Sequence, residues 1–211
     1  RDDIDDLGPI APRPEGCNAS ETEVIGGVLL QPGRWDFDQI VLTVDAALKK
    51  TEAGSLWGIL AVGYRGARRY VLDDRSDRFE PDEAVAVLKA MAEHWRPDRI
   101  LIEDKAGGPG MACTIEIDMG NGNFPMAIVE LFNPGIPDKE ARVNVAAPVF
   151  ANGFVYLLEN APWLTDFLEE ISMFPHGLTD DRTDALVQTV LHDRGSSFTL
   201  PSSAQWSQAG L

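Results

Sequence analysis

The 211-residue chain has few of the residues that build disulfide frameworks and zinc sites. It contains two cysteines, Cys17 and Cys113, and three histidines, His94, His176 and His192. Two thiols that far apart give no disulfide framework, and the histidines show no metal-ligand spacing. The sequence therefore excludes a disulfide scaffold and a zinc knuckle, and it favours a reducing, cytoplasmic environment.

Long apolar runs are also missing. No stretch approaches the roughly 20 apolar residues that a membrane span needs, and no charged-then-apolar leader is visible. We therefore expect neither a membrane span nor a secretion signal. Hydrophobic residues make up 44% of the chain and charged residues 25%, as in an ordinary globular protein. The start at Arg1 suggests a piece of a longer protein.

Positive charge is scarce. Lys and Arg total 18 against 34 Asp and Glu, so the formal net charge is -16. This balance argues against a general nucleic-acid coat, because DNA is held mainly through cations on its phosphates. It does not exclude an enzyme that meets DNA through a local basic strip and bound metal ions.

The order of patterns predicts one folded domain between two less regular ends. Residues 1–36 are predicted to be a linker or N-terminal extension, 37–195 the domain, and 196–211 a flexible tail. An apolar stretch at 24–30 leaves an edge strand open as the alternative to a linker there.

Within the domain, strands and helices alternate. A helix is predicted between Pro81 and Pro97, because apolar residues recur there at helical spacing. The first and fourth strands should be parallel neighbours across that helix, which predicts an α/β fold with a mixed sheet and flanking helices. The strands are predicted at 40–45, 56–64, 69–73, 99–103, 127–132 and 155–158, and further helices at 111–119, 138–150, 162–174 and 180–193.

Two acids follow buried strands. Asp45 comes directly after Ile40–Val44, and Glu103 after Ile100–Ile102. A carboxylate at such a place is costly to desolvate unless it is paired or binds a metal. Sites in open α/β sheets lie beyond the carboxyl ends of the strands. Taken singly, each acid could equally end a strand or start a turn in solvent.

A third acidic element is the segment 179–184, Thr-Asp-Asp-Arg-Thr-Asp. Asp181 and Asp184 lie three residues apart and Asp180 and Asp184 four apart, so each pair can share a helix face. Asp180 by itself favours a helix cap over a ligand. Carboxylates from three elements, without clustered His or Cys, suit Mg²⁺ or Mn²⁺. Two such ions roughly 4 Å apart can activate water and stabilise the leaving oxygen of a phosphodiester.

The order of these motifs over residues 38–194 resembles a known family. The most specific parts are Pro-Asp-Lys-Glu-Ala-Arg at 137–142 and Phe-Pro-His-Gly-Leu-Thr-Asp-Asp-Arg-Thr-Asp-Ala at 174–185. With the strand ending in Asp45 and the strand ending in Glu103, they resemble the C-terminal nuclease domain of the phage terminase large subunit, which has an RNase H-like fold.

The resemblance implies a metal-dependent endonuclease that cuts concatemeric double-stranded viral DNA during genome packaging, in the cytoplasm of the host cell. The implied catalytic metal ligands are Asp45, Glu103 and Asp181, with Asp180 and Asp184 as close candidates, and the implied cofactor is two Mg²⁺ or Mn²⁺ ions.

The resemblance also implies partners. The family protein carries an ATPase motor N-terminal to the nuclease, and the portal and the small terminase subunit are further candidate partners. This sequence has no Gly-x-x-x-x-Gly-Lys-Ser/Thr loop, so we expect no ATP hydrolysis from it. Residues 1–36 are the expected tether to the motor.

Basic residues near these motifs are the candidate DNA contacts, through phosphates rather than base edges. Lys139 and Arg142 lie three apart on one helix face, and the resemblance favours a functional role for them. For the group from Arg65 to Arg78 a solvated surface is equally favoured. The full set of candidates is Lys105, Lys139, Arg142, Arg182, Arg65 and Arg68.

Two other functions remain open from the sequence. Another RNase H-like nuclease, such as a junction resolvase or a transposase core, would carry similar acids. A non-catalytic docking module would use the acidity to bind a basic partner. Selective cleavage of four-way junctions would favour the former, and tight partner binding without metal the latter.

Overall fold

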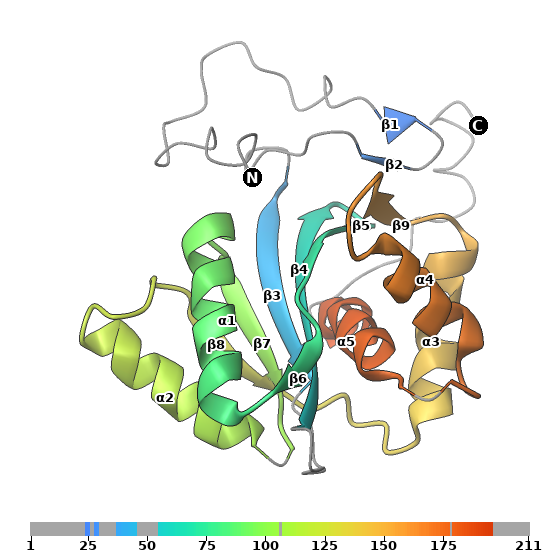
Figure 1. The fold of residues 1–211 in the computed structure, drawn as a ribbon. Helices are drawn as coiled ribbons and strands as arrows, with labels where there is room; N and C mark the ends of the chain where they lie inside the picture. Colours follow the sequence, from blue (N-terminus) through green and yellow to red (C-terminus); the bar gives the residue numbers. More distant parts are fainter. Residues whose placement is uncertain are drawn as a thin grey trace.

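The structure is a computed structural model that describes residues 24–25, 28–29, 37–45, 55–105, 107–177 and 179–195. Its described residues form one sheet with five helices (Figure 1). The strands are β1 (Val24–Ile25), β2 (Val28–Leu29), β3 (Gln39–Asp45), β4 (Ser55–Arg65), β5 (Arg68–Asp74), β6 (Asp77–Phe79), β7 (Arg99–Glu103), β8 (Ile128–Phe132) and β9 (Val155–Leu158). The helices are α1 (Pro81–Trp95), α2 (Gly108–Gly120), α3 (Lys139–Ala151), α4 (Leu164–Met173) and α5 (Asp181–Gly195).

The sheet is mixed, with the order β1-β2-β9-β5-β4-β3-β7-β8, and β6 pairs with β4. β3 runs antiparallel to β4 and parallel to β7, and β7 runs parallel to β8. The predicted parallel pairing of the first and fourth long strands is therefore confirmed. Val44 pairs with Ile102 in the parallel β3–β7 register. The next residues, Asp45 and Glu103, therefore lie side by side at the ends of these two strands.

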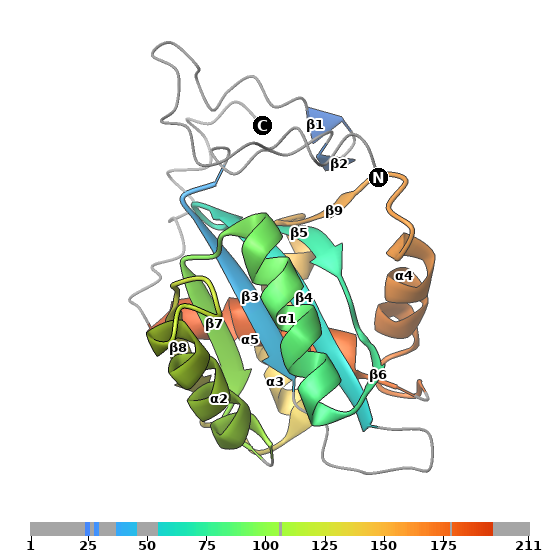
Figure 2. The ribbon, with the colours of Figure 1, turned by 60° about the vertical axis from the view of Figure 1, so that its left-hand side comes forward.

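The helices cover both faces of the sheet (Figures 1 and 2). α1 and α2 pack on one face, and α5 packs on the other with α3 and α4 beside it. β3 is buried on both sides: Leu42 and Val44 face the α1 side, and Val41 faces the α5 side. Such two-sided burial is why this strand reads as a nearly continuous apolar run.

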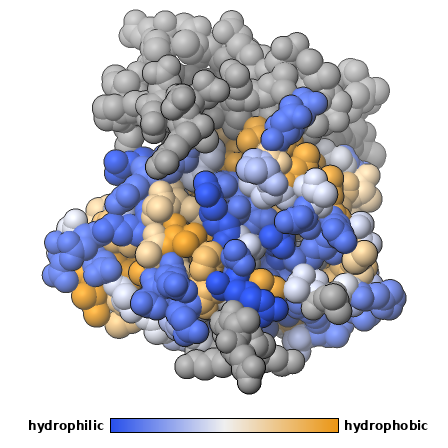
Figure 3. Space-filling view, in the orientation of Figure 1, coloured by the Kyte–Doolittle hydropathy of each residue, from blue (hydrophilic) through white to orange (hydrophobic). Residues whose placement is uncertain are grey.

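The surface of the described residues is mostly hydrophilic. Over the described residues, Figure 3 shows mostly hydrophilic side chains on the face seen in Figure 1, with smaller hydrophobic areas between them. None of the helices in the described segments has the length and apolar character needed to cross a bilayer.

Two short parts of the sheet differ from the sequence prediction. β6 was not predicted, because three residues are too few for a periodic pattern; it pairs with the start of β4. The stretch 24–30 contains the edge strands β1 and β2, and β2 lies parallel to β9. The edge strand left open for this stretch is thus present at Val24–Ile25 and Val28–Leu29, whose backbone pairs onto the edge formed by β9, and the rest of the predicted extension 1–36 lies outside the described residues. The predicted tail, 196–211, lies outside the described residues.

Candidate metal centre

Asp45 and Glu103 meet at the carboxyl ends of β3 and β7. Both residues are buried, at 7% and 4% exposure, and their carboxyl groups lie close enough for each to shift the pKa of the other. Two ionised carboxylates side by side repel one another, so the one with the raised pKa, Asp45, tends to keep its proton. The pair is therefore a place where a cation would replace the proton.

α5 brings the third acidic element to the same place. Thr43 Oγ1 donates to the carbonyl oxygen of Ala185 at 3.0 Å, and Gln188 Nε2 donates to that of Val44 at 3.3 Å, so α5 is bonded directly to β3. As a result, Asp184 and Asp181 lie close enough to Asp45 for their charges to raise its pKa.

Gly58 allows this close approach. It is the partner of Asp45 in the β3–β4 register, and a Cβ atom built on it would lie 2.2 Å from the carbonyl oxygen of Asp181. Any larger residue would collide with the first turn of α5. A glycine inside a strand often marks such a contact, and this one sits between Trp57 and Ile59. A glycine within this otherwise apolar strand is therefore the feature of the sequence that points to the contact with α5.

The carboxyl groups perturb one another strongly. Burial raises the pKa of Asp45 well above its usual range, and the hydrogen bond with Glu103 and the charge of Asp184 raise it further. Burial, together with the charges of Asp180 and Glu170, raises the pKa of Asp181 to about 6. Burial also raises the pKa of Asp184, although Lys139 and Arg142 oppose the effect.

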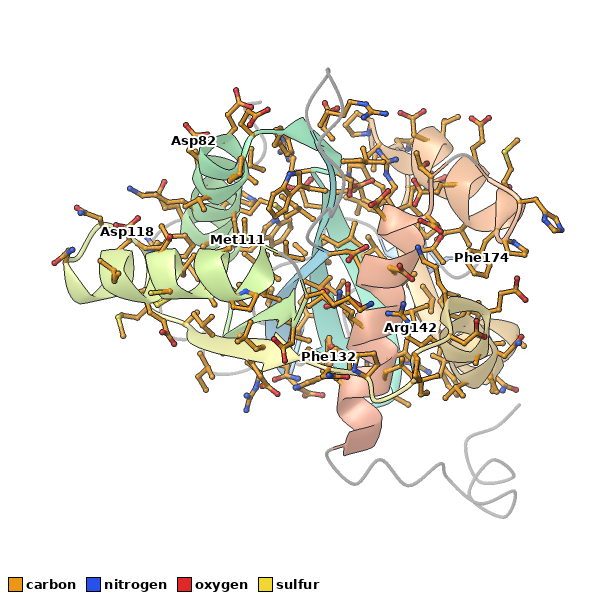
Figure 4. The ribbon with its side chains drawn as sticks, turned by 90° about the horizontal axis from the view of Figure 1, so that it is seen from below. Asp82, Met111, Asp118, Phe132, Arg142 and Phe174 are labelled. Carbon is orange, nitrogen blue, oxygen red and sulfur yellow. The ribbon has the colours of Figure 1, made fainter. Side chains whose placement is uncertain are left out.

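Glu103 behaves in the opposite way. Burial acts to raise its pKa, but the hydrogen bond with Asp45 and the cations Lys105 and Arg142 outweigh burial and leave the pKa below its ordinary value. Lys105 Nζ lies 2.5 Å and Arg142 Nη1 3.0 Å from Glu103 Oε1. Figure 4, which looks onto this end of the sheet, shows Arg142 beside α5. Glu103 is thus the ionised member of its pair with Asp45.

Lys139 bridges two acids of the α5 segment. Its Nζ lies 2.6 Å from Asp180 Oδ1 and 2.6 Å from Asp184 Oδ2. Burial acts to lower the pKa of Lys139, but these two hydrogen bonds outweigh it and raise the pKa. The ammonium group therefore occupies carboxylate oxygens that a metal ion would otherwise take.

The remaining basic candidates lie elsewhere. Arg182 is not at the acidic cluster: its guanidinium pairs with Asp74 at 2.6 Å and Glu170 at 3.1 Å, and its side chain is 16% exposed. This ion pairing favours a structural role over the predicted DNA contact. Arg65 and Arg68 flank the β4–β5 hairpin, at the end of the sheet where β3 begins. At about 3.3 Å per strand residue, that hairpin is roughly 20 Å from Asp45.

The donor set fits a hard divalent cation. All its ligands are carboxylate oxygens, which suit Mg²⁺ or Mn²⁺. Asp184 Oδ1 is buried and has no hydrogen-bond partner among the described residues. Five carboxylates, at 45, 103, 180, 181 and 184, face three cations, Lys105, Lys139 and Arg142. Fully ionised, the cluster would keep two unbalanced negative charges, which is the charge of one divalent ion.

The side chains are not yet arranged around an ion. Within the described ranges, no group of three or more His, Cys, Asp or Glu side chains is positioned as a metal site. The contacts above give the reason, because Lys139 holds Asp180 and Asp184, and Glu103 is held by Lys105 and Arg142. An ion that takes Asp180 Oδ1 or Asp184 Oδ2 must therefore displace Lys139.

Comparison with known proteins identifies the family. The family model "Terminase RNaseH-like domain" matches residues 42–193, which include Asp45, Glu103 and the whole 180–184 segment. The chain belongs to this family. The resemblance to the terminase large-subunit nuclease domain, drawn from the sequence alone, is thereby confirmed. No curated protein matches the chain.

Solved structures of terminase nucleases share the fold of this terminase domain. The terminase nuclease domain of human cytomegalovirus, soaked with Mn, is 16% identical, with a TM-score of 0.55 over 78% of this chain and 88% of that one. The large terminase nuclease domain of bacteriophage SPP1, with bound Mn, is 10% identical, with a TM-score of 0.52 over 80% of this chain and 97% of that one. The predicted RNase H-like fold is confirmed.

Proposed function

We propose that this terminase RNase H-like domain is a divalent-metal-dependent endonuclease that hydrolyses phosphodiester bonds of concatemeric double-stranded viral DNA during genome packaging. The observation that carries the proposal is the convergence of buried carboxyl groups from β3, β7 and α5, which are close enough to shift one another's pKa values. The Mn bound by the SPP1 nuclease domain and the Mn soak of the cytomegalovirus nuclease domain support Mn²⁺ or Mg²⁺ as the ion.

The structure supports distinct roles for the acids. Asp45, Glu103 and Asp181 are the proposed catalytic ligands, and Asp184 joins them because its buried Oδ1 has no partner in the described part of the chain. Asp180 is the weaker candidate, since its side chain is 42% exposed and is held by Lys139. When bound, the metal would lower the pKa of a water molecule and stabilise the leaving oxygen.

A two-ion site makes an additional demand on Lys139. Its ammonium occupies Asp180 Oδ1 and Asp184 Oδ2, so a second ion at these oxygens requires Lys139 to move away. The phosphate backbone of DNA offers an alternative partner for that ammonium. We therefore propose that DNA binding and the filling of a second metal position are linked through Lys139.

The three cations of the cluster divide into two kinds. Arg142 is 6% exposed and stays on Glu103, so its proposed role is to hold that carboxylate in position. Lys105 and Lys139 are 44% and 32% exposed, so each is open to a phosphate approaching from solvent. They are the proposed DNA contacts nearest to the acids. DNA, the ATPase motor of the full-length protein, the portal and the small terminase subunit are the proposed partners, in the host cytoplasm.

Plasmid nicking tests the proposal. Purified domain with Mn²⁺ or Mg²⁺ should convert supercoiled DNA into nicked and linear forms, and Asp45→Asn should abolish cutting without unfolding the protein. Asp82→Asn, at an exposed acid on α1, is the matched control and should cut like the wild type. Intact plasmid over a wide range of metal and protein concentrations would refute the activity, and full activity of Asp45→Asn would refute the site.

The same assay separates the other RNase H-like functions. A four-way junction and a linear duplex of the same sequence are offered in competition. A terminase-type nuclease should cut both at similar rates, whereas selective cutting of the junction would favour a resolvase.

A further inference from the structure

Glu170, on the buried side of α4, makes an unusual set of contacts. Its side chain is 3% exposed, and both carboxylate oxygens accept hydrogen bonds from the α5 segment. Oε1 accepts from the backbone N–H of Arg182 at 2.7 Å and of Thr183 at 3.3 Å. Oε2 accepts from Thr179 Oγ1 at 2.9 Å and from Arg182 Nη1 at 3.1 Å.

These contacts make Glu170 a cap that is supplied by a different helix. The first N–H groups of an α-helix have no partner within the helix, and a negative charge near them is stabilising. In most helices a residue just before the helix provides the cap. Here α4 provides it, so the position of α5 depends on the position of α4.

Asp74 on β5 supplies a second anchor for the same turn. Arg182 Nε donates to Asp74 Oδ2 at 2.6 Å, and the Asp74 side chain is fully buried. Asp74 Oδ1 is itself fixed by the backbone N–H of Ser76 at 2.8 Å. Arg182 is therefore tied to α4 and to the sheet at once, while Gly58 meets the other side of the turn. Together these contacts determine where Asp181 and Asp184 lie.

We propose that Glu170 is a positioning residue: through the backbone of Arg182 and Thr183 it holds the first turn of α5 so that Asp181 and Asp184 face Asp45 and Glu103. The inference rests on the proposed function, because Glu170 can position metal ligands only if Asp181 and Asp184 bind the metal. Glu170 touches neither the substrate nor the ion. Residues that orient metal ligands typically change metal affinity by about 10- to 100-fold when they are removed.

The test compares Mn²⁺ affinity, measured by titration calorimetry on the metal-free domain, among four variants. Glu170→Ala removes every contact and should weaken Mn²⁺ binding by about 10- to 100-fold. Glu170→Gln keeps an oxygen for the two backbone N–H groups but loses the charge, so its affinity should fall in between. Glu169→Gln, at the exposed neighbour on α4, should bind like the wild type.

A fourth variant separates positioning from general loss of stability. Leu88→Ala opens a cavity in α1, on the opposite face of the sheet, where Leu88 is 0% exposed. It should lower the melting temperature but leave Mn²⁺ affinity unchanged, whereas Glu170→Ala should change both. Equal Mn²⁺ affinity of wild type and folded Glu170→Ala would overturn the inference.

Hydrogen exchange keeps the inference separate from the proposed function. The amides of Arg182 and Thr183, which donate to Glu170, should exchange faster in Glu170→Ala than in Glu169→Gln. If the wild type takes up no Mn²⁺, the proposed function is wrong. Whatever the metal result, amide exchange that is unchanged in Glu170→Ala would overturn the positioning role.

Discussion

Gly58→Ala should push the acidic element of α5 away from β3. The new Cβ would lie 2.2 Å from the Asp181 carbonyl oxygen, whereas ordinary contact begins at 3.4 Å. The first turn of α5 must therefore retreat by roughly 1 Å, because a backbone carbonyl cannot rotate away as a flexible side chain can. Overpacking of this kind costs about 1–3 kcal/mol of stability.

The effect on activity should be at least comparable to the effect on folding. A displacement of about 1 Å in a catalytic group can cost on the order of 100-fold in rate. We expect Gly58→Ala to remain folded, with a lower urea midpoint, and to nick plasmid about 100-fold more slowly in Mn²⁺. Urea denaturation followed by tryptophan fluorescence, together with initial rates of nicking, measures both quantities.

Two glycine variants serve as controls. Gly63→Ala is in the same strand, and its Cβ would lie 2.5 Å from the Phe37 ring, so it should lose stability without a specific loss of activity. Gly110→Ala, in α2, meets nothing within 4 Å and should be neutral or slightly stabilising. If Gly58→Ala is as stable and as active as the wild type, the close packing of α5 against Gly58 does not determine the geometry of the acidic cluster.

Two further predictions concern charge. Lys139→Met should weaken DNA binding and reduce the slope of log affinity against log salt by about one, because one phosphate contact is lost; an unchanged slope in a fluorescence-anisotropy salt titration would contradict the contact. For pH, burial raises the pKa of Asp181 to about 6 from an unfolded value of 3.8, so the folded metal-free domain binds more protons than the unfolded chain between these values. The contribution of Asp181 to the stability of the domain should thus be highest below about pH 4 and fall as the pH rises through about 6. Asp181→Asn should flatten that part of the profile of urea midpoint against pH. A wild-type profile that matches the variant would show that the pKa of Asp181 is not raised.

The sequence was sufficient to predict that the acids at the two strand ends meet, but not to predict the residues that hold α5 beside them. Asp45 and Glu103 could be predicted to meet because each follows a buried apolar strand and because a crossover helix makes those strands parallel. Glu170 could not be found in this way. It sits on α4 among apolar positions, and its partners become visible only when α4 packs against α5.

The positions of the candidate arginines follow from helix and strand geometry. Arg182 is next to Asp181 in the chain, but successive residues on a helix point about 100° apart, so Arg182 turns toward Asp74 and Glu170. Arg65 ends β4, which runs antiparallel to β3, and Arg68 begins β5. The hairpin after β4 must therefore lie beside the start of β3, far from Asp45, and the strand directions alone already require this.

Hydrogen bonding separates two structural acids, Asp74 and Glu170, from two candidate ligands, Asp45 and Asp184. Asp74 and Glu170 are as deeply buried as Asp45 and Asp184, but each faces N–H and guanidinium donors. Asp45 instead faces another carboxyl group, and Asp184 Oδ1 has no partner within the described segments. A buried oxygen without a donor costs free energy in the metal-free protein. A cation would relieve that cost at Asp45 and Asp184, whereas at Asp74 and Glu170 it would only disrupt existing hydrogen bonds. A metal should therefore select the acids at the end of β3 and the start of α5.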